Sequence, residues 1–93
     1  MPLKDERFKQ AVAQFAQENE LEKVLVETVP GRCWVYSPDG KLEAEGVPTW
    51  KIEPKLDARY AVCFKTEGTP DGYWDCVVYE GDAVIEETLM EAV

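Results

Sequence analysis

The sequence predicts an α+β domain in which one N-terminal helix packs on a curved meander of five to seven antiparallel strands. Apolar residues near the N-terminus recur with the 3.6-residue period of a helix, whereas from Lys23 onward they alternate with the period of two that is typical of half-buried strands. The length of 93 residues corresponds to a single domain, residues 1–93, with one modest hydrophobic core.

The N-terminal helix is expected from Leu3 to about Asn19. Asp5 and Glu6 suit the positive end of the helix dipole, and Asn19 is a plausible stop. The apolar residues of this segment fall on one helical face: Phe8, Ala11, Val12, Phe15 and Ala16. We therefore expect Phe8, Val12 and Phe15 to face the sheet.

Three strands are expected after the helix: Lys23–Val29, Arg32–Tyr36 and Lys41–Gly46. Pro30-Gly31 and Ser37-Pro38-Asp39-Gly40 provide the turn chemistry between them. The second turn predicts a register in which Tyr36 faces Leu42 and Trp34 faces Ala44. These four residues form the better core face of the predicted hairpin.

Pro48 and Pro54 flank Thr49–Glu53, which we expect to be a short strand or an extended crossing at an edge. Ala58–Thr66 has the clearest strand pattern. Further strands are expected at Tyr73–Glu80 and from Ala83 to about Thr88.

Gly81-Asp82 is a two-residue hairpin signal between the last two strands. The simplest register places Trp74 opposite Leu89, Cys76 opposite Glu87 and Val78 opposite Ile85. Under this register Asp75 and Glu86 share a face with Tyr73, Val77, Tyr79 and Val84.

A helix of about five turns is too narrow to cover both faces of such a sheet. The second face is therefore buried either by rolling of the sheet or by another chain, which leaves a monomer and a homodimer open. The rolled alternative resembles the cystatin-like roll in architecture. No family signature accompanies that likeness.

The C-terminal third of the chain is strongly acidic. Residues 66–93 contain eight Asp and Glu residues and no Lys or Arg, and the net charge of the whole chain is −9. Nucleic-acid binding relies on cationic contacts to phosphate, so we expect none, and anionic membrane surfaces are disfavoured for the same reason. A solvated acidic face that maintains solubility is the ordinary alternative to a partner-binding face.

The residue types that usually carry catalysis are scarce. The chain has no histidine, which removes the commonest general base and metal ligand. Cys63 lies between Arg59 and Lys65 in sequence, but a small apolar filler within a strand is the commoner role of such a cysteine. We therefore expect no enzyme and no cofactor.

A metal site is also not expected. The candidate ligands are Asp71, Asp75, Glu80 and Asp82. Calcium takes about six to eight oxygen ligands, and these residues are too widely spaced in the sequence to supply them from one compact loop.

The three cysteines, Cys33, Cys63 and Cys76, are odd in number and include no CxxC, which favours free thiols. The N-terminal residues include no apolar signal segment, and no stretch approaches the length of a membrane span. These features lead us to expect a cytoplasmic protein.

Two functions remain as hypotheses. The first is a protein-interaction module, such as an inhibitor, immunity factor or adaptor, that binds a basic protein through the last hairpin. Its predicted partner-binding residues are Tyr73, Asp75, Tyr79 and Glu86.

The second hypothesis is a small-molecule carrier or binding domain. Its apolar pocket would lie between the helix and the sheet, as ligand sites often do between packed elements. The predicted lining residues are Trp34, Tyr36, Tyr60 and Phe64.

Overall fold

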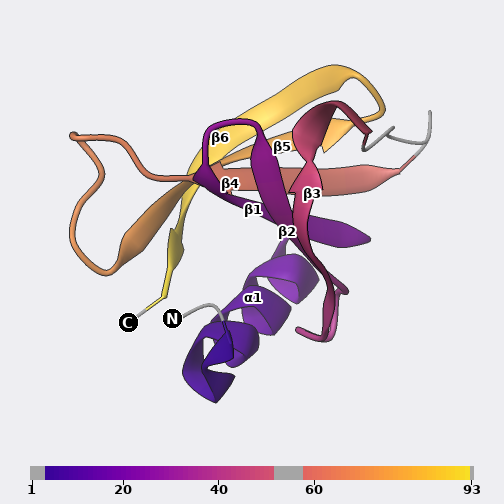
Figure 1. Cartoon of the computed structure of the whole chain (residues 1–93). Coiled ribbons are helices and arrows are strands. Elements are labelled where there is room, and N and C mark those ends of the chain that lie inside the picture. Colours follow the sequence, from indigo (N-terminus) through magenta and orange to yellow (C-terminus); the bar gives the residue numbers. More distant parts are fainter. Residues whose placement is uncertain (1–3, 52–57, 93) are drawn as a thin grey trace.

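The computed structural model describes residues 4–51 and 58–92. One helix packs against a six-stranded sheet, which confirms the predicted α+β class (Figure 1). The elements in chain order are α1 (Glu6–Glu18), β1 (Lys23–Val29), β2 (Arg32–Tyr36), β3 (Leu42–Pro48), the 3-10 turn η2 (Thr49–Lys51), β4 (Arg59–Phe64), β5 (Tyr73–Glu80) and β6 (Ala83–Glu91).

Helix α1 begins and ends at side chains that satisfy its terminal backbone groups. The carboxylate of Asp5 accepts a hydrogen bond of 2.8 Å from the backbone N–H of Arg7. At the other end, the side-chain amide of Asn19 donates to the carbonyl of Phe15 at 2.9 Å. The predicted stop at Asn19 is therefore confirmed: its side-chain amide and its backbone N–H, at 3.1 Å, both donate to the carbonyl of Phe15 in the last turn.

The strand order is β3-β2-β1-β4-β5-β6, and every neighbouring pair is antiparallel except β1 and β4. This parallel pair in the middle of the sheet departs from the predicted antiparallel meander. Val24, Leu25 and Val26 of β1 are all buried, so the strand is apolar on both faces. Such a continuous apolar run suits a central strand, and β4 occupies the side of β1 that β2 leaves open.

The main core lies between α1 and the face of the sheet that it covers, here called the inner face. Phe8 connects the layers, because its ring centroid lies 5.7 Å from that of Tyr36 and 5.8 Å from that of Trp74. Both contacts are edge-to-face arrangements, which aromatic quadrupoles favour. The buried residues of this core also include Val12, Phe15, Ala16, Leu21, Val24, Val26, Ala61, Cys63, Cys76, Val78 and Met90.

A second, smaller core lies on the opposite face, here called the outer face. It is built around Leu25, Cys33 and Val35, with Ala44, Val47, Tyr60 and Val62 packed against them. Leu25 is 2% exposed and Cys33 is fully buried. The chain therefore buries the outer face over β1 and β2 by itself.

Bulges change both predicted hairpin registers. Tyr36 lies opposite Leu42, as predicted, but Val35 rather than Trp34 lies opposite Ala44, because Glu43 is an extra residue on β3. Ala44 consequently packs in the outer core and not with Trp34.

The last hairpin shifts in the same way. Tyr79 pairs with Val84 and Val78 with Glu86, so Ile85 is an extra residue on β6. The predicted pairs are each wrong by one position: Trp74 opposes Met90, and Cys76 opposes Thr88. Met90 rather than Leu89 therefore enters the main core.

Between the two halves of the sheet, Thr49–Lys51 forms a 3-10 turn in place of the predicted strand. The rest of that predicted segment, through Glu53, lies outside the described residues, as does Pro54. In the described part of the chain, no helix combines the length and the apolar character needed to cross a membrane.

Candidate functional site

The predicted partner-binding residues are divided between the two faces of the sheet. Directly paired residues project to the same face, so Tyr73, Asp75 and Tyr79 of β5 belong to the outer face. Glu86 lies opposite Val78, a residue of the main core, and therefore belongs to the inner face. The bulge at Ile85 causes this separation, and Glu87, opposite Val77, takes the outer-face position that was expected for Glu86.

Tyr79 is part of an aromatic pair on the outer face. It stacks on Tyr60 of β4 with the ring centroids 5.1 Å apart and the planes inclined by 12°. Burial raises the pKa of the Tyr60 phenol, and Tyr79 and Asp82 raise it further by electrostatic repulsion. The two half-buried rings extend the outer core toward β5.

Asp75 has a local structural role. Its carboxylate accepts hydrogen bonds from the hydroxyls of Thr69 and Thr66, both in the connection between β4 and β5. The side chain is half-buried. Asp75 therefore fastens this connection, and only part of its charge faces solvent.

The four residues predicted for a ligand pocket do not come together. Trp34 and Tyr36 pack on the inner face under α1. Tyr60 packs in the outer core, and Phe64 projects to the same outer face. The reason is that Ala61 and Cys63 of β4 enter the main core, which turns the alternate residues of that strand outward.

Strand β6 exposes an unusual combination of side chains. Val84, Ile85 and Leu89 are 59%, 45% and 44% exposed. The strand also carries Glu86, Glu87 and Glu91, all of them exposed. We call these six residues the β6 surface.

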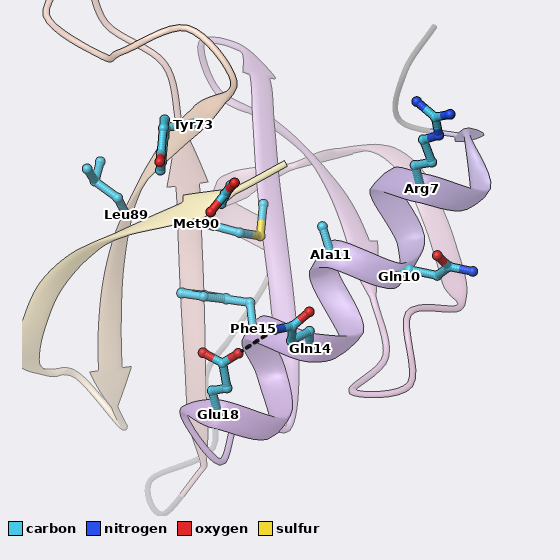
Figure 2. A pocket seen from close by; sticks show the side chains of 10 residues that line it. Arg7, Gln10, Ala11, Gln14, Phe15, Glu18, Tyr73, Leu89 and Met90 are labelled. Carbon is cyan, nitrogen blue, oxygen red and sulfur yellow. Dashed lines mark hydrogen bonds between the residues drawn. The ribbon is translucent and has the colours of Figure 1, made fainter. Parts of the chain in front are cut away.

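A groove of about 630 Å³ separates α1 from β6 (Figure 2). Phe15 and Met90 point into it from the two sides, at its apolar floor. Gln14 donates a hydrogen bond of 2.8 Å to Glu18 along its helical wall. The groove is lined by Arg7, Gln10, Ala11, Gln14, Phe15, Glu18, Tyr73, Leu89, Met90 and Glu91.

Sequence reasoning missed this groove, although part of its helical wall was visible in the helical pattern. Arg7, Gln10, Gln14 and Glu18 follow one another at intervals of three or four residues, so they form one stripe along α1. The opposite wall depends on Met90, whose inward position follows from the bulge at Ile85.

The three thiols are buried and unbridged. Cys63 lies directly opposite Cys76 on the neighbouring strand. Burial raises the pKa of the Cys63 thiol well above its ordinary value, and the adjacent Cys76 adds to the effect. Burial also raises the pKa of Cys33, although a hydrogen bond with Thr49 lowers it in part. A reactive cysteine requires the opposite shift.

The two cations that flank Cys63 in the sequence are engaged elsewhere. Arg59 donates from Nε to the carbonyl of Asn19 at 3.1 Å. Lys65 lies over the ring of Trp74, with its Nζ 4.9 Å from the ring centroid. Neither observation supports activation of the Cys63 thiol.

Over residues 4–51 and 58–92, Cys, Asp and Glu form no group of three or more that could hold a metal ion. No protein-family model matches the chain, and comparison with curated proteins and with solved structures finds no significant match.

Proposed function

We propose that the chain is an acidic protein-interaction module whose last hairpin binds a basic protein. The observation that carries this proposal is the β6 surface, where three large apolar side chains are exposed beside three glutamates. Large apolar side chains exposed along one strand beside charged residues suit a partner-binding site. The carboxylates provide the complementarity that steers a cationic partner toward it.

The distribution of charge supports the same proposal. The described residues from Thr66 onward include no Lys or Arg, so the carboxylates of β5 and β6 have no cation on their own hairpin. By contrast, the glutamates of β3 are paired: Glu43 lies 3.3 Å from Lys23, and Glu45 lies 3.0 Å from Lys4. The hairpin therefore offers its negative charge to an external cation.

The groove between α1 and β6 favours a second candidate, a small-molecule binding domain. Its volume of about 630 Å³ suits a small ligand. However, six of its ten lining residues are polar or charged, whereas ligand sites are lined predominantly by apolar side chains. The interaction module is therefore the better-supported function.

Affinity capture from the source cells tests the proposal when the wild-type chain is compared with two charge variants. Glu87→Lys/Glu91→Lys reverses two outer-face charges of β6, and Glu20→Lys/Glu22→Lys makes the same change in net charge near the end of α1. All four glutamates are exposed. Asp75 is left unchanged in these variants. It accepts hydrogen bonds from Thr66 and Thr69, so its replacement would disturb folding as well as charge.

We expect the wild type and the Glu20/Glu22 variant to retain a basic partner that the Glu87/Glu91 variant loses. The affinity for that partner, measured by calorimetry, should fall as ionic strength rises, because surface charges are screened. Equal retention by all three chains, or a partner without net positive charge, would contradict the proposal. A small molecule that binds in the groove and contacts Gln10 and Gln14 would favour the second candidate.

A further inference from the structure

We infer that the open edge of β6 binds an extended basic segment of the partner as an additional strand. This inference rests on the proposed function and specifies how the partner is held. A strand at the edge of a sheet presents unpaired backbone N–H and C=O groups along one side. Addition of a peptide strand to such an edge is an established mode of protein recognition, in which backbone hydrogen bonds provide affinity and side-chain contacts provide specificity.

The two edges of this sheet differ in how open they are. β3 contains two bulges, and it ends at Pro48, which lacks an N–H. The carbonyl of Gly46 on β3 already accepts a hydrogen bond of 2.7 Å from Arg32. These features are typical of an edge that is protected against pairing.

β6 lacks most of that protection. It is nine residues long and contains neither proline nor glycine. Its register with β5 is regular from Glu86 to Glu91, because its single bulge lies near the turn. Among the described residues, no strand pairs with its other side. A run of six regular residues is long enough to pair with an ordinary strand.

The charge of β6 decides between a second copy and a basic segment. An antiparallel pair of two β6 strands would place Glu86, Glu87 and Glu91 of both copies in one ladder, with no Lys or Arg on either strand. Like charges across a strand pair destabilise it. Lysine or arginine at the facing positions would instead form cross-strand ion pairs, so the edge selects a cationic segment.

The two faces of β6 also specify the pattern of that segment. In alternation with Thr88 and Met90, β6 carries Glu87, Leu89 and Glu91, which calls for a cation, an apolar residue and a second cation at alternate positions of the added strand; Leu89 and Glu91 also line the groove. Toward the inner face it presents Thr88 and Met90 beside the groove along α1 (Figure 2). Side chains on that face of the segment would meet the groove, which is why the groove belongs to the same recognition surface.

A synthetic peptide of about ten residues tests this inference, since strands of that length are common. It carries lysines opposite Glu87 and Glu91 and a valine opposite Leu89, and its ends are blocked. Two N-methylated versions remove alternate backbone donors: one set would face β6, and the other set would face solvent. A fourth peptide replaces the lysines with glutamates. Binding to the full chain is followed by NMR titration and amide hydrogen exchange.

We expect one methylated peptide to bind at least about tenfold more weakly than the parent, while the other changes little, because only one set of donors bonds to β6. Alternate amides of β6 should exchange more slowly in the complex. The glutamate peptide should not bind. Replacement of Glu87 and Glu91 with lysine in the protein should weaken binding of the parent peptide, because both cross-strand ion pairs are lost.

Equal binding of both methylated peptides would overturn the inference and leave the proposed function standing, since a basic peptide would then be held by charge alone. Failure of the parent peptide to bind would overturn it as well, and the capture experiment would then judge the proposed function independently. Concentration-dependent dimerisation through β6, seen by sedimentation, would show that the edge takes a second copy and would also overturn the inference.

Discussion

Gly40 lies directly against the backbone carbonyl of Lys9 in α1. A β-carbon placed on Gly40 would lie 2.3 Å from that carbonyl oxygen and 3.2 Å from the β-carbon of Ala13. The backbone of Gly40 also has a φ of +84°, which side chains of L-residues rarely adopt. The turn between β2 and β3 therefore closes onto the helix only because this residue has no side chain.

Gly40→Ala is expected to destabilise the protein by about 2–5 kcal/mol, the sum of the left-handed backbone cost and the steric conflict with α1. Gly31→Ala is the matched control. Its φ is +83°, yet no atom lies within 4 Å of the added carbon, so only the backbone cost of about 1–2 kcal/mol applies. Urea unfolding measures the loss of stability in each of the two variants. Equal losses would show that the turn does not press on the helix.

Phe8→Ala is expected to lower the free energy of unfolding by about 3–5 kcal/mol. The side chain is 4% exposed, and its ring contacts both Tyr36 and Trp74. Phe8→Leu retains most of the volume and should cost less, because it loses mainly the aromatic contacts. Chemical denaturation checks that Phe8→Ala loses more stability than Phe8→Leu. A loss below about 1 kcal/mol for Phe8→Ala would mean that α1 is not docked as described.

The three cysteines should resist a thiol reagent in the folded protein. All three are buried, and burial raises the pKa of Cys33 and Cys63, so little reactive thiolate is present at neutral pH. Mass spectrometry after brief exposure to such a reagent should show an unmodified chain, and the same exposure in denaturant should show three additions. Rapid labelling of the native chain would contradict the burial of these residues.

Stability should fall in alkaline solution. The folded protein holds the pKa of Cys63 well above the ordinary value of 9.0, and burial likewise raises that of Tyr36 above 10.0. Above pH 9 the unfolded chain therefore loses protons that the folded chain retains, which favours unfolding. Below pH 9 these two groups contribute no pH dependence.

Urea unfolding at about pH 7, 9 and 10.5 measures this effect, since the linkage relation gives the slope of stability against pH. The fall above pH 9 should be smaller in Cys63→Ala than in the wild type, even if the variant is less stable at neutral pH. A wild-type stability that stays constant over this range would refute the prediction.

The three tryptophans should differ in their accessibility to acrylamide. Trp50 is 78% exposed, with Lys51 Nζ 5.4 Å from its ring centroid, whereas Trp74 is 8% exposed. Fluorescence quenching should fall sharply in Trp50→Phe, and the stability of that variant should change by less than about 1 kcal/mol. Unchanged quenching would place the accessible indole elsewhere.

The features that follow from local sequence could be predicted. Asp5 and Asn19 bound the helix at the chain positions where their side chains are chemically suited to cap it. The turns at Gly31, Gly40 and Gly81 all have positive φ, and the Pro, Asp and Gly residues of these segments located the hairpins in the sequence. The strands that flank these turns were located from the sequence, whereas the strand or extended crossing expected at Thr49–Glu53 is a 3-10 turn over Thr49–Lys51.

The register and the site depended on features without a local signal. Glu43 and Ile85 are the extra residues of two bulges, and neither differs in type from a regular strand residue. The slip at Ile85 moved Glu86 to the inner face and brought Met90 to the groove. The place of β4 beside β1 depends on pairing across the chain, which the spacing of apolar residues does not encode.

The parallel seam between β1 and β4 has a consequence for protein synthesis. β1 emerges from the ribosome early, and β2 soon covers one of its sides, but the other side has no partner until Arg59–Phe64 have been made. During that interval a nascent chain displays the apolar strand that will become the middle of the sheet. Unpaired strands of this kind promote aggregation, so the first half of the chain should depend on molecular chaperones far more than the finished protein does.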